Sequence, residues 1–169
     1  MNLSSFDAIF FFSRITIGSF QHIFPIVFTF IFGIIFINFA KRKLKDKQQK
    51  KALHVFGCFI SLFVIIFHAH KISLGGYNIS TDLPLYLCSL LGTIIPIFTY
   101  YRKFWMYEVL LFWIIGGTLQ AVITPDIEFG FPSFDYFRYW VVHLGILIVI
   151  FYATFVFNMR PKLKSVFKS

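Results

Sequence analysis

The sequence predicts an all-α fold, a polytopic bundle of five membrane-spanning helices that forms one integral-membrane domain over residues 1–169. Two observations predict this fold class. The chain of 169 residues is 58% hydrophobic, 22% aromatic and only 14% charged, which is too apolar for an ordinary soluble domain. In addition, its basic residues gather on alternate connections between long apolar runs. Both features are typical of a membrane protein and argue against a soluble enzyme.

Five apolar runs approach the length that a bilayer core requires, roughly 20 residues per helix. The predicted spans cover residues 21–40, 52–69, 83–100, 104–123 and 139–158. Asp82 followed by Pro84 is a favourable helix start for the third span. In the fourth span, Gly116 and Gly117 predict close packing against another helix, of this chain or of a second membrane protein.

The distribution of Lys and Arg predicts the orientation of these spans. Thirteen of the 16 basic residues fall on alternate connections: seven in 41–51, two at Arg102-Lys103, and four from Arg160 onward. Because short cytoplasmic connections are enriched in Lys and Arg, we expect the N-terminus outside and the C-terminus inside. Attraction to anionic lipid explains the net charge of +9. The expected partner is therefore membrane phospholipid and not nucleic acid.

Several polar side chains are predicted to share one depth near the outer ends of the spans. Cys88 lies in the outer third of the third span, Gln120 and Asp126 near the outer end of the fourth, and His143 early in the fifth, with His22 at the start of the first. Polar groups at membrane depth are costly and often mark a functional site. A thiol and an imidazole at one depth suggest nucleophilic catalysis.

Structural explanations exist for the same residues. Buried cysteines commonly pack as small apolar side chains, and Gln120 could join two helices. His68 and His70 lie at a span end, where histidines often face the headgroups. The histidines have no compact ligand spacing, so we expect neither a metal nor a cofactor. Cys58 and Cys88 differ in predicted height by roughly 12–15 Å at 1.5 Å per residue, which is too far for a disulfide.

Three elements of the sequence resemble a known family: the Leu83-Pro84-Leu85-Tyr86-Leu87-Cys88 run, the stretch from Phe112-Trp113 through Gly116-Gly117 and Gln120-Ala121 to Thr124-Pro125-Asp126, and His143. They resemble the YwaF-type integral membrane proteins, which are similar to the transmembrane protein 164 group of lipid acyltransferases. The resemblance implies that Cys88 takes an acyl group with help from His143. Many relatives have His at the position of Tyr86 and continue past Arg160-Pro161 with about two more spans. We therefore expect about seven spans in the family and a fragment or degenerate member here.

The leading functional hypothesis is a lipid acyltransferase or lipid hydrolase of the cell membrane. Cys88 would be the nucleophile and His143 the base, while His22, Gln120 and Asp126 would bind substrate and Gln120 would donate to the oxyanion. The alternative is a non-enzymatic membrane protein, such as a small transporter or binding subunit, with the polar layer as its outer vestibule. A lipid-sized groove that reaches Cys88 favours the enzyme, whereas a continuous polar pore favours transport.

Overall fold

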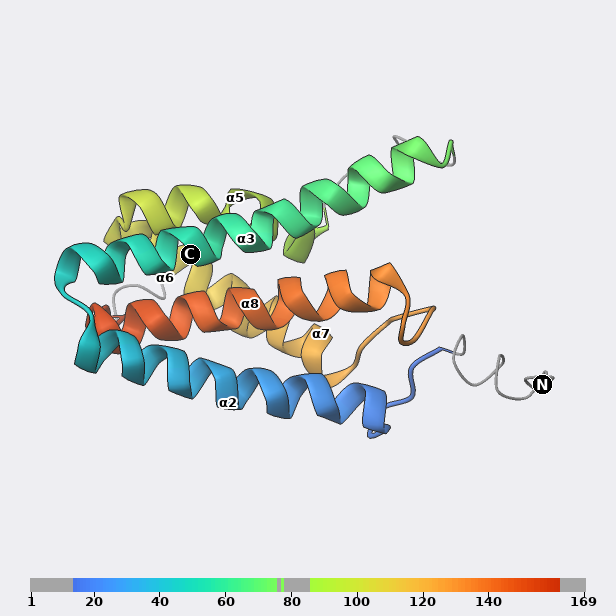
Figure 1. The fold of residues 1–169 in the computed structure, drawn as a ribbon, viewed down its shortest axis with the longest axis horizontal. Coiled ribbons are helices and arrows are strands. Elements are labelled where there is room, and N and C mark those ends of the chain that lie inside the picture. Colours follow the sequence, from blue (N-terminus) through green and yellow to red (C-terminus); the bar gives the residue numbers. More distant parts are fainter. Residues whose placement is uncertain (1–13, 76, 78–85, 162–169) are drawn as a thin grey trace.

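The computed structural model of the chain describes residues 14–75, 77 and 86–161, and within these ranges every regular element is helical (Figure 1). The helices are α2 (Phe20–Lys43), α3 (Asp46–Ser73), α5 (Leu87–Tyr101), α6 (Phe104–Trp113), the π-helix η1 (Ile114–Thr118), α7 (Leu119–Ile123) and α8 (Phe134–Val156). The elements α6, η1 and α7 follow one another directly and form one run, Phe104–Ile123. The prediction of an all-α bundle is confirmed.

Four of the helical runs are long and apolar enough to cross a membrane: Phe20–Lys43, Asp46–Ser73, Phe104–Ile123 and Phe134–Val156. The predicted third span corresponds to α5, which has 15 residues and is shorter than a usual span. Residues 83–85 of that prediction lie outside the described residues. The first and fourth predicted spans match α2 and the Phe104–Ile123 run closely.

Two helices extend beyond the membrane spans predicted from hydropathy, whose own boundaries stay predictions. The helix that contains the predicted span 52–69 covers Asp46–Ser73, because lysines and glutamines before the apolar run are good helix formers. The helix that corresponds to the predicted span 139–158 covers Phe134–Val156. It begins early because the Ser133 hydroxyl accepts a hydrogen bond from the backbone N–H of Tyr136 at 3.1 Å, which caps the helix. Hydropathy marks the membrane-embedded part of a helix and misses the turns beyond it.

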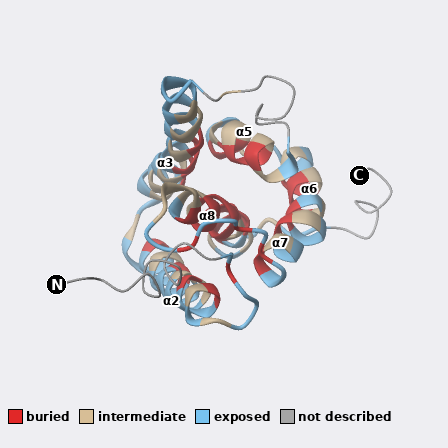
Figure 2. Cartoon of the chain, turned by 90° about the vertical axis from the view of Figure 1, so that its right-hand side faces the viewer, coloured by how far each residue is buried: buried red, intermediate tan, exposed pale blue. Residues whose placement is uncertain are grey.

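Helix α8 lies at the centre of the bundle, and the other helices surround it (Figure 2). Of the apolar windows of the long helices, that of α8 is 67% buried, whereas that of α2 is only 11% buried. The main core gathers side chains from α3, α5, α6 and α8, among them Ile60, Leu91 and Ile146. Helix α2 is therefore the least buried of the four long helical runs.

Contacts between the helices show that they alternate in direction. Helices α2, α5 and α8 run one way, and α3 and the Phe104–Ile123 run go the other way. The contacts that set these directions are Gly57–Thr99, Ser61–Thr93, Gly92–Val142, Gly145–Ile60, Tyr107–Thr154, Tyr139–Ala121, His22–Trp140 and Phe36–Tyr152. The connections 41–51 and 102–103 consequently lie at the same end of the bundle as Val156, and this end is called the basic end below. The membrane face at which the basic end lies stays a prediction.

Small residues allow the helices to approach closely, as they do in membrane bundles. A Cβ atom added at Gly145 would lie 2.9 Å from the side chain of Ile60, and one added at Gly117 would lie 2.6 Å from Leu87. Around Gly116, by contrast, the described residues place nothing within 4 Å. Within this chain the close contact predicted for the glycine pair therefore lies at Gly117, and Gly116 faces open space. Packing against a second protein stays a prediction.

Candidate functional site

The Cys88 thiol lies where α5 meets the π-helix η1. Cys88 belongs to the first turn of α5 and is half-buried. Its Sγ atom is 3.7 Å from Oγ1 of Thr118, a fully buried residue that ends η1. Both cysteines of the chain are free thiols, as predicted. The thiol is thus held in a polar contact at a helix–helix interface and does not pack solely against apolar atoms.

The π-helix positions Thr118 beside this thiol. At its end the backbone N–H of Leu119 donates to the carbonyl of Ile114, five residues earlier. Such wide turns are rare and frequently occur at functional sites. Neither η1 nor the role of Thr118 was predicted from the sequence, because one wider turn leaves the hydrophobic pattern of a fully apolar run almost unchanged. The glycine pair inside η1 was the one available signal.

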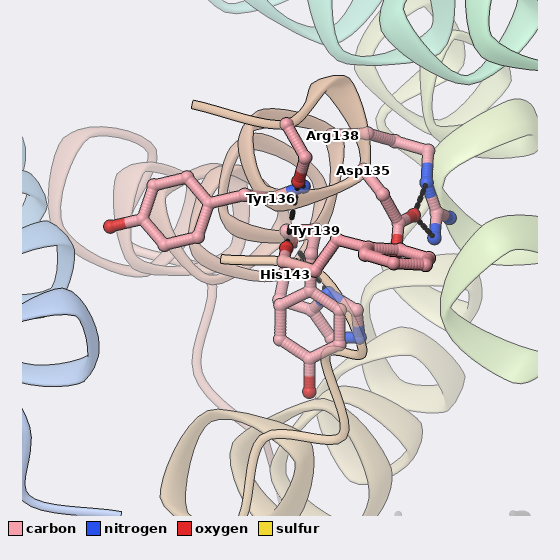
Figure 3. A network of polar contacts seen from close by, with 7 residues as sticks. Asp135, Tyr136, Arg138, Tyr139 and His143 are labelled. Atoms are coloured by element: carbon pink, nitrogen blue, oxygen red, sulfur yellow. Dashed lines mark hydrogen bonds and ion pairs between the residues drawn. The ribbon is translucent and has the colours of Figure 1, made fainter. Parts of the chain in front are cut away.

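His143 is a buried residue of α8 whose imidazole is oriented by Tyr139. Its Nδ1 atom is 2.7 Å from the carbonyl oxygen of Tyr139, and the two rings stack with centroids 4.0 Å apart. A carbonyl oxygen only accepts hydrogen bonds, so Nδ1 carries the hydrogen. In the neutral ring the lone pair is then at Nε2, the protonation state that a general base needs. Figure 3 shows Tyr139 and His143 pointing together, away from Tyr136.

Cys88 and His143 lie on facing elements without a direct bond. In the described ranges the hydrogen bond of the Cys88 thiol is to Thr118, and none joins it to His143. Tyr139 lies beside His143, because its ring stacks on the imidazole and its hydroxyl donates a hydrogen bond to the Ala121 carbonyl of α7. Tyr139 was not predicted as part of this site, although its spacing of four residues from His143 indicates a contact along a helix.

Side chains of α2 and α8 and the backbone of Thr124 bind the last carbonyls of α7. The hydroxyl of Tyr139 donates to the Ala121 carbonyl at 2.7 Å, and the backbone N–H of Thr124 donates to Gln120 at 2.9 Å. Nε2 of His22 is 2.9 Å from the Val122 carbonyl and donates to it. These groups satisfy helix-end acceptors that would otherwise lack partners. This set of contacts is called the α7 clasp.

His22 uses both of its ring nitrogens within the protein. Nδ1 accepts a hydrogen bond from the backbone N–H of Gly18 at 2.9 Å, and Nε2 donates to the Val122 carbonyl in the α7 clasp. The ring is 5% exposed and stacks on Trp140 with centroids 5.8 Å apart. The geometry therefore gives His22 a structural task, and its predicted contact with substrate stays a prediction.

Gln120 and Asp126 lie at the surface near the end of α7 that is opposite the basic end. The Gln120 amide donates to the Thr124 hydroxyl at 3.3 Å, and Asp126 forms an ion pair with Arg14. The two charged side chains are 79% and 71% exposed. The hydrogen bond to Asp126 raises the pKa of the Arg14 guanidinium. The structure thus separates the predicted polar layer: Cys88 and His143 face the interior, whereas Gln120 and Asp126 do not.

A large apolar groove runs along the opposite side of α8, between α2 and α3. Its volume is about 950 Å³, which suits a lipid chain or a comparable ligand. Phenylalanines of α2 and α3 line much of it, namely Phe20, Phe24, Phe28, Phe32, Phe56 and Phe59. Neither Cys88 nor His143 belongs to its lining. The groove therefore has the size expected for a lipid site without reaching the predicted nucleophile.

Residues 17–169 match the TMEM164 family, so the match includes every element that carries the site. The chain belongs to the TMEM164 family. The resemblance to the transmembrane protein 164 group is thereby confirmed. No curated protein and no solved structure matches the chain. Family membership together with four helices of spanning length makes this TMEM164-family chain a membrane protein.

Proposed function

We propose that this TMEM164-family protein is a lipid acyltransferase or lipid hydrolase of the cell membrane, with Cys88 as nucleophile and membrane phospholipid as substrate. One observation carries the proposal. The Cys88 thiol is held at a π-helix, and the facing helix α8 presents His143 with Nδ1 engaged by a carbonyl. A free thiol and an imidazole whose Nε2 carries the lone pair are the two groups that thiol-dependent acyl transfer needs.

In the proposed reaction, Nε2 of His143 takes the proton of the Cys88 thiol. The thiolate attacks the ester carbonyl of the phospholipid, and an S–C bond forms while the ester C–O bond breaks. The lysolipid oxygen leaves with the proton from His143. Transfer of the acyl group from Cys88 to an acceptor hydroxyl completes an acyltransferase cycle, and transfer to water completes a hydrolase cycle. Proton transfer requires Sγ and Nε2 within about 3–4 Å, so Cys88 turns from Thr118 toward His143.

The predicted substrate-binding residues Gln120 and Asp126, together with Arg14, suit the headgroup of a phospholipid in this proposal. Arg14 and Asp126 present a cation and an anion at the outer end of α7, and Gln120 lies one turn away. A zwitterionic headgroup offers the complementary phosphate and ammonium groups. We assign these three residues to headgroup binding, and Thr118, already beside the thiol, to the donation of a hydrogen bond to the oxyanion.

The test follows an acyl label from phospholipid to protein. The purified full chain in nanodiscs receives phospholipid with a labelled acyl chain, and the label on protein and the release of lysolipid are measured. We expect both in the wild type and in the matched control Cys58→Ala, and neither in Cys88→Ala. His143→Gln is expected to lower the initial rate about 100-fold, a usual contribution of a general base. Equal transfer in Cys88→Ala and wild type would contradict the assignment of the nucleophile.

The position of the large groove favours a second candidate, a non-enzymatic lipid-binding protein. The groove between α2 and α3 has an apolar lining that includes Thr29 but neither Cys88 nor His143. In this case a photoreactive phospholipid crosslinks to the wild type and to Cys88→Ala alike, and Thr29→Trp, which fills the groove, prevents crosslinking. The absence of lysolipid release in the preceding assay then separates binding from catalysis.

A further inference from the structure

A second thiol–imidazole pair lies at the basic end of the bundle, on α3. The Sγ atom of Cys58 is 3.7 Å from Nε2 of His54, one helical turn earlier. Nδ1 of the same ring is 3.2 Å from Oγ1 of Thr99 on the neighbouring helix α5. Cys58 is exposed and His54 is half-buried. No site at Cys58 and His54 was predicted from the sequence, because the predicted polar layer lies at the other end of the spans.

Thr99 fixes which nitrogen of His54 carries the hydrogen. The Thr99 hydroxyl donates its one hydrogen to the backbone carbonyl of Pro96 at 3.0 Å. Its contact with His54 is therefore that of an acceptor, and Nδ1 of the imidazole is the donor. The lone pair of the neutral ring is then at Nε2 and faces the Cys58 thiol. Nucleophile, base and orienting group are thus arranged in the order that activated thiols require.

The residues around the pair change from cationic to apolar along one face of α3. Lys47, Lys51, His54 and Cys58 follow at intervals of four, three and four residues, so they share that face. Lys51 and Cys58 are separated by about 10 Å along the axis at 1.5 Å per residue. Beyond the lysines, Val55, Phe59 and Leu62 are exposed apolar side chains. The thiol is therefore placed between a cationic surface and a surface suited to hydrocarbon.

We propose that Cys58 and His54 form an acyl-accepting site whose donor is a long-chain acyl thioester of a phosphorylated carrier thiol, such as an acyl-coenzyme A. This proposal is independent of the reaction at Cys88. The lysines match the phosphates of the carrier, and the apolar side chains match the acyl chain. His54 takes the proton of Cys58, the thiolate attacks the thioester carbonyl, and the new S–C bond replaces the bond to the carrier. The carrier thiolate leaves and takes the proton from His54. The products are S-acyl Cys58 and the free carrier thiol.

The experiment incubates the full chain in nanodiscs with labelled palmitoyl-coenzyme A. We expect the label on Cys58 in the wild type and in Cys88→Ala, release of that label by neutral hydroxylamine, and no label in Cys58→Ala. An unlabelled wild type, or a label that persists in Cys58→Ala, would overturn the proposal. The phospholipid assay depends on Cys88, whereas this assay depends on Cys58. A negative result for one proposal would therefore leave the other unaffected.

Variants of the two orienting residues separate catalysis from folding. His54→Asn keeps a donor near Thr99 and removes the base, so we expect acylation about 100-fold slower or more. Thr99→Val is expected to slow the reaction and Thr99→Ser to restore it. Alkylation of Cys58 by iodoacetamide provides a readout without acyl donor. Below pH 8 we expect it to be faster in the wild type than in His54→Asn, and equal rates would exclude His54 as the base.

Substitution of Lys47 and Lys51 tests whether the acyl donor is a phosphorylated carrier. In the variant with Lys47→Glu and Lys51→Glu, we expect a higher KM for palmitoyl-coenzyme A and an unchanged rate of alkylation by the small neutral reagent. An unchanged KM would overturn the assignment of a phosphorylated carrier.

Discussion

At the scale of single residues, the imidazole of His22 has the clearest energetic consequence. It joins the turn before α2 to the end of α7 through hydrogen bonds of 2.9 Å at each nitrogen. His22→Ala would leave a buried carbonyl at Val122 without its donor. We expect a loss of about 1–3 kcal/mol in the free energy of unfolding, the usual cost of an unsatisfied buried acceptor. Thermal unfolding in detergent measures it, with the exposed His70→Ala as the control. An equal effect of both substitutions would contradict the role of the α7 clasp.

The position of a side chain along its helix could be predicted from the sequence better than the direction in which that side chain points. Counting residues from span ends placed Cys88 and His143 in the same half of the bundle, and both turn toward its interior. The same counting placed Gln120 and Asp126 beside them, yet these side chains are exposed. A fully apolar span has little amphipathic pattern, so its hydropathy does not identify which face meets the other helices. Contacts between side chains on different helices, such as the contact between Cys88 and Thr118, consequently cannot be predicted without the three-dimensional structure.

At the scale of elements, the π-helix η1 determines how α5 meets the fourth span. The side chain of Leu87 packs so closely against Gly117 that a Cβ atom would not fit between them, whereas Gly116 faces open space. Gly117→Leu is expected to displace the start of α5 and to cost about 1–3 kcal/mol, as overpacking does. Gly116→Leu adds the same side chain on the open side and is expected to cost less. Unfolding in detergent and transfer from phospholipid to Cys88 measure the difference. Equal losses would show that the Leu87 contact is unimportant.

The five apolar runs could be assigned from sequence because burial in lipid selects for length and hydropathy, and both are local properties. Their ends could not, because helix caps and solvated turns extend α3 and α8 beyond the apolar residues. Ser133 followed by Asp135 is a capping signal that could have located the start of α8. A widened turn such as η1 has no comparable local signature. Such features depend on the packing of neighbouring helices.

At the scale of the whole molecule, the alternation of the helices separates two thiol–imidazole regions. Cys88 and His143 lie toward the end opposite the basic connections, whereas Cys58 and His54 lie near them. If the basic end is cytoplasmic, as the distribution of Lys and Arg predicts, a water-soluble acyl thioester reaches Cys58 from the cytoplasm. A phospholipid of the outer leaflet then reaches Cys88. The orientation of the bundle therefore decides which substrate each thiol meets.

Thiol labelling in intact cells tests this orientation. Gln48 and Glu128 are exposed and lie at opposite ends of the bundle. In a background with Cys58→Ala and Cys88→Ala, we expect Gln48→Cys to resist a membrane-impermeant thiol reagent and Glu128→Cys to react readily. Both positions are expected to react after the cells are permeabilised, which shows that each thiol is accessible. The reverse pattern would invert the bundle and bring Cys88 and His143 to the inner leaflet. The predicted spans put an odd number of membrane crossings between Gln48 and Glu128, so the two positions should lie on opposite faces of the membrane. Labelling of both positions from outside would therefore contradict the predicted spans.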